Sequence, residues 1–515
     1  MAEESFQVQN MGNKLLKNTI IVSFIVVLGK ILSFVVNILI TYYFGATRET
    51  DCFFVANNVP SIIYTSVISS YIVLFLPTYK EVQVTKGIDS ANKYASIMLN
   101  ILILISLGLT TLGILVQKYV IELIAPGFNE SNINICVRMS SILLLSFPFS
   151  SISTYLATIS NANHKYYASQ IIPIISSVIS IISIFLFYQY GIYSYIYAAV
   201  FSYIIQLIVQ IIIVKDGFNY EILGISLSPE VKKIFVLFLP VYIGYSIDQI
   251  NVIISSSLCT YLEDGSVSCF NYATRLHVSI MSCISLVVIT ILYPILSELY
   301  SSGRIESFWN NVKYGLKYIF ITTIPLSFFL CLNSKSIIKL VYGRGGFSEE
   351  SVISTSTVFC SISLSLLFLI VRELVIRVFY IKNDTKTPLK ASILYCMINL
   401  LLGIVLMKLI GIGGIALSYL IASIISVSFL TIQIKKDIID WVKTREVLYE
   451  VLMFVFLTIF IHYILKMFDY YIFRLVIEFV FVYFCIFLYL LYRKDDLAKL
   501  VLEKIKGLYH IQNRL

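Results

Sequence analysis

The sequence predicts an all-α integral membrane protein with fourteen transmembrane helices, arranged as two parallel-repeat lobes of six helices plus two C-terminal helices. Three observations support this fold class. Of the 515 residues, 58% are hydrophobic and 13% are charged, whereas an average soluble domain has about 45–50% and about 25%. The apolar runs are long enough, at about 20 residues or more, to cross a bilayer as helices. In addition, an internal repeat relates the two halves of the chain.

The apolar runs fall into two groups of six and a final pair. The first group covers 19–44, 52–79, 95–116, 136–160, 166–187 and 193–214. The second group covers 234–258, 269–293, 314–332, 352–380, 391–407 and 412–434, and the final pair covers 447–465 and 470–492. We therefore expect a tail at 1–18, lobes at 19–215 and 216–434, a helix pair at 435–492 and a basic tail at 493–515.

An even number of spans places both termini on the same side of the membrane. The segments on that side carry 25 of the Lys and Arg residues, and the opposite loops carry 7. Because cytoplasmic loops are enriched in Lys and Arg, both termini are predicted to be cytoplasmic. Residues 1–18 are polar and lack the short apolar core and small-residue cleavage site of a secretory signal, so we expect no cleavage there.

The two groups of six spans resemble each other in sequence. The matched positions are 52, 53, 56, 77 and 81 with 269, 270, 273, 294 and 298, then 127, 128 and 130 with 346, 347 and 349, and finally 168–169 with 391–392. The shift is 217 residues for the first set and rises to 219 and 223. Six helices separate the copies, so both should have the same orientation, related by an axis along the membrane normal. Duplicated bundles of this kind suit alternating access across a central cleft.

Composition argues against several other classes of protein. The short loops leave no room for a catalytic domain, so we expect a transporter with no catalytic residues. The nine cysteines form no CxxC pair and the four histidines are far apart, which predicts no metal site. The run Gly343-Arg344-Gly345-Gly346 lacks the Lys-Ser/Thr ending of a phosphate-binding loop, so we expect no nucleotide. The basic residues lie between spans and form no single face, which argues against nucleic acid.

Lys30 and Asp248 are the charged residues placed deepest in their predicted spans. Lys30 lies about eleven residues into its helix, roughly 16 Å from either end, too deep to snorkel to the surface. It should face an aqueous cavity or an anion, or form an internal ion pair with Asp248. Alternatively, Asp248 with Gln249 and Asn251 could coordinate a coupling proton or sodium ion.

A structural role can account for each of the other charged residues in the spans, in addition to a functional one. Arg275 is shallow enough to snorkel, although its planar fork also suits a diphosphate. Asp51 follows Thr50 and has the pattern of a helix N-cap. The remaining charges lie at helical spacing, which favours structural pairs within a helix. They are Arg372, Glu373 and Arg377 in one span and Arg474 and Glu478 in another.

Several motifs resemble those of the MurJ/MviN lipid II flippases, a branch of the multidrug/oligosaccharidyl-lipid/polysaccharide exporters. They are Tyr43-Phe44-Gly45-Ala46, Thr50-Asp51-Cys52-Phe53-Phe54-Val55-Ala56, Val59-Pro60, Gln249-Ile250-Asn251, Gly265-Ser266-Val267-Ser268, Asn271-Tyr272-Ala273-Thr274-Arg275-Leu276, Gly343-Arg344-Gly345-Gly346-Phe347-Ser348, Arg377-Val378-Phe379-Tyr380 and Asn383-Asp384-Thr385-Lys386-Thr387-Pro388. The resemblance covers both predicted lobes, and fourteen helices also match the family.

The resemblance implies a substrate, a location and partners. The substrate would be a disaccharide-pentapeptide on a polyprenyl diphosphate, carried from the inner to the outer leaflet of a bacterial cytoplasmic membrane for cell-wall synthesis. The last two spans would form a groove for the lipid tail. Membrane lipids and the cell-wall synthesis machinery are the implied partners. No cofactor is expected, and a sodium gradient, a proton gradient and the membrane potential all stay open as driving forces.

The resemblance also implies roles for individual residues. Lys30 and Arg275 would bind the diphosphate, and Asp51, Asn58 and Tyr64 complete the expected head-group set. The candidates for ion coupling or gating are Asp248, Gln249, Asn251, Arg372, Glu373 and Arg377.

The chain departs from the arginine-rich cavity of that family. Val36 and Tyr64 stand where arginines are common, Ser69 lies near the usual acidic residue, and Ser255-Ser256 replace a common Asp-Arg pair. Tyr, Ser and Asn can still hold a glycan through hydrogen bonds. Another polyprenyl-diphosphate-linked saccharide, as in capsule or exopolysaccharide export, is therefore the alternative substrate. A cation-coupled drug exporter and a non-transporting membrane scaffold are further alternatives.

Overall fold

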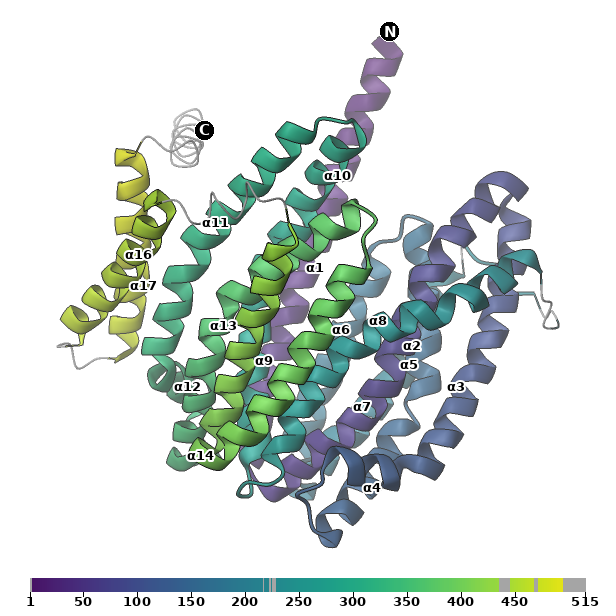
Figure 1. Cartoon of the computed structure of the whole chain (residues 1–515). Coiled ribbons are helices and arrows are strands. Elements are labelled where there is room, and N and C mark those ends of the chain that lie inside the picture. The colour runs from purple at the N-terminus through teal and green to yellow at the C-terminus, as the bar shows by residue number, and fades with distance from the viewer. Residues whose placement is uncertain are drawn as a thin grey trace, which may run out of the picture. The chain divides into compact units, whose positions relative to one another are not determined.

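The computed structural model of the chain is built of helices (Figure 1). It describes residues 2–215, 217–221, 224, 228–434, 445–466 and 471–493. Within these ranges no strand is present. The predicted basic tail at 493–515 lies outside the described residues, except for Arg493. The chain forms two compact units, one made of Met1–Tyr272 with Tyr342–Val352 and the other of Ala273–Val341 with Ile353–Leu515.

The first unit holds the N-terminal helices. They are α1 (Ala2–Phe44), α2 (Arg48–Lys86), α3 (Ile88–Ile124), α4 (Glu130–Leu144), α5 (Phe147–Ala162), α6 (Tyr167–Phe187), the 3-10 turn η1 (Tyr188–Tyr190), α7 (Tyr193–Val214), α8 (Pro229–Cys259) and the start of α9 (Ser266–Val287). In this unit α2 packs against α3, α4, α5 and α8, and α1 packs against α6.

The second unit holds most of the remaining helices. They are the rest of α9, the π-helical turn η2 (Val288–Leu292), α10 (Tyr293–Ser301), α11 (Ile305–Leu332), α12 (Ser334–Tyr342), α13 (Glu349–Ile381), α14 (Lys386–Ile432), α16 (Arg445–Leu465) and α17 (Tyr471–Tyr492). Here α16 and α17 pack against each other and against α11, around Ile324, Phe454, Ile461 and Val482. The final helix pair is therefore attached to this unit mainly through α11.

The prediction of an all-helical membrane protein is confirmed, since the predicted spans overlap helices and ten helices of the described chain are long and apolar enough to cross a membrane. The ends and breaks of several helices differ from the prediction. Helix α1 begins at Ala2, because the polar residues before position 19 include no proline to stop it. The predicted spans 391–407 and 412–434 form a single element, α14, that bends at Gly411 (φ 58°, ψ −137°). The short helix α12 is not predicted from the sequence.

The predicted span 136–160 is broken into α4 and α5 by Pro148. A helical residue at position 148 would donate its N–H to the carbonyl of Leu144, but proline has no N–H to donate. The hydroxyl of Tyr64 on α2 donates to this carbonyl instead, at 3.0 Å. The Tyr64 ring also stacks on Phe147, with ring centroids 3.5 Å apart. A buried tyrosine thus compensates for the interrupted helix.

Tyrosines also fill the core of the first unit. Tyr71, Phe75, Tyr94 and Tyr155 pack together, and each is less than 5% exposed. The Tyr71 hydroxyl donates to the Met98 carbonyl at 2.5 Å, and the Tyr155 hydroxyl donates to a carbonyl of the same helix, α3. Because lipid tails are as apolar as the helix surfaces, helices in a membrane associate through close packing and hydrogen bonds of this kind.

Asp384 caps the start of α14 in the second unit. Its Oδ1 accepts hydrogen bonds from the N–H groups of Lys386 and Thr387, both at 3.0 Å, and its Oδ2 accepts one from the Thr387 hydroxyl at 2.7 Å. These bonds stabilise the charged carboxylate, and those from Thr387 contribute most to lowering the pKa of Asp384 below its usual value of 3.8. The Asn383–Pro388 motif therefore builds a helix start outside the spans.

We expect Asp384→Ala to destabilise the first turn of α14 by about 1 kcal/mol, because two backbone N–H groups lose their acceptor. Hydrogen–deuterium exchange of the peptide that begins α14 measures this. Because the pKa is lowered in the folded state, the stabilisation is present above the usual carboxyl pKa and is lost as the pH falls through the lowered pKa. Asp384→Asn, which keeps one acceptor, should be intermediate. Equal exchange in all three proteins would contradict the capping role.

Candidate functional site

Two threonines in the first unit cap the start of α2, directly after the end of α1. Thr47 is the N-cap of α2 and Thr50 is its partner, since the Thr50 hydroxyl accepts from the Thr47 N–H at 2.8 Å and the Thr47 hydroxyl accepts from the Thr50 N–H at 3.4 Å. This reciprocal pair satisfies the helix start. The prediction that Asp51 is the N-cap of α2 is therefore wrong, because the threonines already fill that role.

Asp51 instead caps a different helix, α9. Its Oδ2 accepts from the Gly265 N–H at 2.6 Å, and its Oδ1 accepts from the Ser268 N–H at 2.7 Å and the Ser268 hydroxyl at 2.5 Å. The side chain is buried, with the residue only 2% exposed. A carboxylate at a helix N-terminus satisfies free N–H groups and interacts favourably with the helix dipole. Asp51 thus joins the start of α2 to the start of α9.

Glycines allow the backbone to approach closely around this contact. Gly45 (φ +62°) and Gly345 (φ +65°) adopt a left-handed conformation, and a Cβ on either would collide with a carbonyl, of Gly346 and of Tyr42 respectively. The Gly346 N–H donates to the Tyr42 carbonyl at 2.7 Å. The glycine-rich run at 343–346 therefore packs against the end of α1. We call Gly45, Thr50, Asp51, Gly265, Ser268, Tyr272 and Gly346 the α2–α9 junction; in it the Tyr272 hydroxyl donates to the Gly45 carbonyl at 2.9 Å.

The two cations expected to bind the head group lie in different units. Lys30 belongs to α1 in the first unit, and its side chain is exposed. The adjacent Gly29 is buried against Pro173 and Ile174 of α6. Arg275 belongs to the part of α9 that lies in the second unit, and it is half-buried. Their role in binding a diphosphate stays a prediction.

The other predicted residues in the first unit differ in exposure. Tyr64 is buried and its hydroxyl donates to the Leu144 carbonyl, whereas Asn58 is half-buried. On α8, Asn251 is buried and Gln249 is half-buried, while the side chain of Asp248 lies outside the described residues. The roles in head-group binding and ion coupling stay predictions for these residues.

The predicted charges on α13 take part in structural contacts within the second unit. The intrahelical pair of Glu373 and Arg377 is confirmed, with Arg377 Nη2 2.6 Å from Glu373 Oε1. The Arg372 guanidinium donates to the Ser392 hydroxyl at 2.5 Å and lies over the Tyr395 ring, 5.6 Å from its centroid. Arg372 therefore links α13 to α14.

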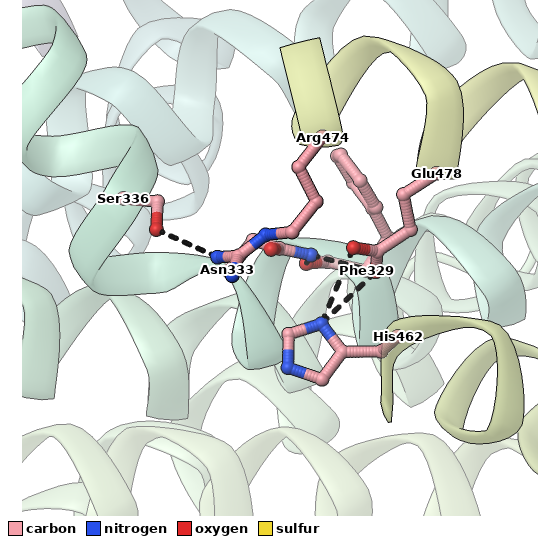
Figure 2. Close-up of polar contacts among 6 residues, drawn as sticks. All are labelled: Phe329, Asn333, Ser336, His462, Arg474 and Glu478. Atoms are coloured by element: carbon pink, nitrogen blue, oxygen red, sulfur yellow. Dashed lines mark hydrogen bonds and ion pairs between the residues drawn. The ribbon is translucent and has the colours of Figure 1, made fainter. Parts of the chain in front are cut away.

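A buried polar cluster on the final helix pair is not predicted from the sequence (Figure 2). The expected pair of Arg474 and Glu478 is absent, because Glu478 hydrogen-bonds to His462 of α16 and Asn333 beyond α11. Arg474 donates to the Ser336 hydroxyl of α12 at 3.3 Å. The only signals in the sequence were a glutamate and a histidine placed within apolar runs.

Long apolar helices that carry charged and hydrogen-bonding side chains within their length are the architecture of a multi-pass membrane transporter. The family model described as lipid II flippase MurJ matches residues 40–484. The chain therefore belongs to the MurJ lipid II flippase family.

Comparisons with individual proteins are consistent with this family. The chain is 27% identical over 426 residues to a probable lipid II flippase MurJ of Buchnera aphidicola subsp. Baizongia pistaciae, covering 79% of this chain and 81% of the relative. A solved lipid II flippase MurJ in an inward closed conformation has a similar fold, with a TM-score of 0.78, 23% identity and coverage of 92% and 99% of the two chains. An inward-facing multidrug-resistance MATE transporter has a TM-score of 0.65 at 13% identity, covering 81% of this chain and 96% of that one.

Asp51→Asn should weaken the α2–α9 junction by about 2 kcal/mol, because the change removes the charge that three hydrogen bonds stabilise. Exchange of the peptide that begins α9, together with the thermal unfolding of the purified protein, measures the loss. Glu49→Gln is the matched control, since Glu49 is exposed in the same helical turn. If Asp51→Asn behaved like that control, the capping role of Asp51 would be ruled out.

Proposed function

We propose that this chain moves lipid II, the undecaprenyl-diphosphate-linked precursor of peptidoglycan, from the inner to the outer leaflet of the bacterial cytoplasmic membrane. The single observation that carries this proposal is the match of the lipid II flippase family model to residues 40–484. The substrate is then a polyprenyl-linked glycolipid, and the protein acts as a transporter and not as an enzyme. Transport serves cell-wall synthesis.

The physical task explains why such a protein needs polar groups inside its spans. A diphosphate and several sugars would each lose hydration in hydrocarbon, at a cost of several kcal/mol per unpaired polar group. A polar route for the head group, with the lipid tail left in the bilayer, lowers this barrier. Net movement requires coupling to an ion gradient, to the membrane potential or to consumption of the product, because equal affinity at both faces shifts no equilibrium.

The finer architecture belongs to the same proposal. Fourteen spans form lobes at 19–215 and 216–434, a tail-binding helix pair follows at 435–492, and both termini lie in the cytoplasm. One contact supports the proposal that a two-fold axis relates the two lobes. Asp51 and Ser268 are 217 residues apart, which is the repeat shift, and they are hydrogen-bonded to each other. Two positions related by a two-fold axis contact each other only near that axis, so the α2–α9 junction would lie on it.

In this proposal, one set of residues binds the head group and another serves ion coupling or gating. Lys30 and Arg275 bind the diphosphate, with Asn58 on α2 among the groups that contact the head group. Asp51 and Tyr64 also belong to the predicted head-group set, but their hydrogen bonds to Ser268 and Leu144 favour a role in holding the helices together. The residues of ion coupling or gating would be Asp248, Gln249, Asn251, Arg372, Glu373 and Arg377.

A second substrate class is favoured by two positions. Val36 and Tyr64 stand where the family commonly has arginines, and they are 5% and 7% exposed. A cavity with fewer cations suits a different polyprenyl-diphosphate-linked saccharide that is held more by hydrogen bonds. Complementation of a bacterium depleted of its own lipid II flippase separates the two classes. Rescue supports lipid II, whereas no rescue at normal expression supports another glycolipid, and gained drug resistance supports an exporter.

Lys30→Ala and Arg275→Ala should each abolish flipping, because the diphosphate then loses a charged partner in a region of low dielectric constant. The measurement is the rate at which labelled lipid II crosses the bilayer of proteoliposomes. Insertion and thermal stability should stay at wild-type values. Lys118→Ala, at an exposed lysine near the end of α3, is the matched control and should transport normally. Normal rates in both Lys30→Ala and Arg275→Ala would disprove the anion-binding mechanism.

A further inference from the structure

A buried polar cluster holds the final helix pair in the second unit. We call Asn333, Ser336, His462, Arg474 and Glu478 the α17 cluster (Figure 2). Glu478 is fully buried, Asn333 is 1% exposed and His462 is 7% exposed. The cluster joins α16 and α17 to the end of α11 and the start of α12.

Glu478 is the centre of the cluster because its carboxylate is shared between two neighbouring segments. Its Oε1 accepts from Asn333 Nδ2 at 2.8 Å. His462 Nδ1 lies 3.1 Å from Oε1 and 3.3 Å from Oε2. One carboxylate therefore connects α17 both to its partner helix α16 and to the end of α11.

Arg474 does not neutralise Glu478 directly. Its guanidinium donates to Ser336, and no ion pair within 4 Å joins it to Glu478 in the described chain. Figure 2 shows Asn333 between the two charged groups. Asn333 Oδ1 and Arg474 Nε have no hydrogen-bond partner among the described residues. The cluster is thus an open polar network rather than a closed salt bridge.

The contact between His462 and Glu478 can hold a proton in more than one way. With Glu478 charged, the neutral imidazole donates from Nδ1, and with an added proton the pair becomes an imidazolium facing a carboxylate or a carboxylic acid facing an imidazole. Imidazole is the side chain that ordinarily changes charge between about pH 5 and pH 8. A proton can therefore enter or leave this contact without a change of rotamer.

We propose that His462 and Glu478 form a proton-binding site whose occupancy controls how firmly α17 is attached to α11 and α12. Without the added proton, the positive charge of Arg474 balances the negative charge of Glu478, and the carboxylate is a strong acceptor for Asn333. Proton uptake gives the cluster a net positive charge. Whether the proton lies on His462 or on Glu478, it draws the electron density of the carboxylate toward His462, so Glu478 becomes a weaker acceptor for Asn333. Both effects favour detachment, so protonation loosens α17.

Other ionisable groups around the site lie toward its edges. The ionisable groups nearest to the pair along the packed segments are Cys331 at the end of α11, Lys335 and Lys339 on α12, Tyr463 and Lys466 at the end of α16, and Arg474, Tyr483 and Cys485 on α17. Lys335, Lys339 and Lys466 are exposed, and α11 carries no charged side chain after Lys317. Within the described part of these helices, Arg474 is the charged group closest to Glu478 along α17.

Hydrogen–deuterium exchange of the full-length protein in detergent tests the proposal without any lipid substrate, so its outcome is independent of the transport function. Protection of the α16 and α17 peptides is measured between about pH 5 and pH 8, and each rate is corrected for the chemical pH dependence of exchange. In the wild type, protection should fall on acidification. Peptides of α3 in the first unit provide the internal reference.

Two variants should shift the response in opposite directions. Glu478→Gln mimics the protonated carboxyl and should increase opening of α17 about tenfold at every pH. His462→Gln keeps a donor to Glu478 but cannot titrate in this range, so α17 should stay protected at low pH. Glu450→Gln is the matched control. It removes a different ion pair between α16 and the end of α17, in which Arg493 Nη2 lies 3.8 Å from Glu450 Oε1. This control should keep the wild-type pH response.

Two results would overturn the inference. One is wild-type protection of α17 that is constant with pH. The other is a normal pH response in His462→Gln, which remains informative even if Glu478→Gln fails to fold. If transport of lipid II is measured in the same variants, a pH-dependent rate in the wild type that becomes constant in His462→Gln extends the proton site to the transport cycle.

Discussion

The structure depends on one constraint, which is that hydrocarbon offers no hydrogen-bond partner to a backbone group. A polypeptide meets this constraint across a bilayer by forming helices, and the described residues outside the loops and turns are helical. The constraint is clearest where a helix is interrupted. Pro148 leaves the carbonyl of Leu144 without its helical donor, and the hydroxyl of Tyr64 replaces it. A buried tyrosine on a neighbouring helix thereby makes the break between α4 and α5 tolerable.

The same constraint explains why the buried carboxylates accept several hydrogen bonds. Asp51 and Glu478 are 2% and 0% exposed, and both accept several hydrogen bonds from another segment. Their partners differ in kind. Asp51 receives two backbone N–H groups and a serine hydroxyl, whose geometry is fixed by the start of α9, whereas Glu478 faces an imidazole that can change its charge. The first arrangement suits a permanent structural contact, and the second suits a contact that responds to its surroundings.

The α2–α9 junction and the α17 cluster hold different helices together. Glycines at positions 45, 265 and 345 bring backbone segments together at the α2–α9 junction, because a Cβ at any of them would lie less than 3 Å from a carbonyl oxygen. The hydrogen bonds of Asp51 hold the starts of α2 and α9 together in this junction. The α17 cluster lies in the other unit and ties the final helix pair to α11. Its attachment concerns the helices proposed to hold the lipid tail.

The sequence by itself determined the all-helical fold class and the positions of the helical segments, because the length and the apolar character of a run are local properties. It also identified the family through motifs such as Thr50–Ala56 and Asn383–Pro388, and it predicted the pair of Glu373 and Arg377, which are four residues apart. Only the tertiary structure decided the partners of Asp51 and Glu478. Asp51 bonds to residues 214 and 217 positions away, and Glu478 bonds to Asn333 145 positions away. Such partners depend on how helices pack against one another, which spacing within a single helix does not specify.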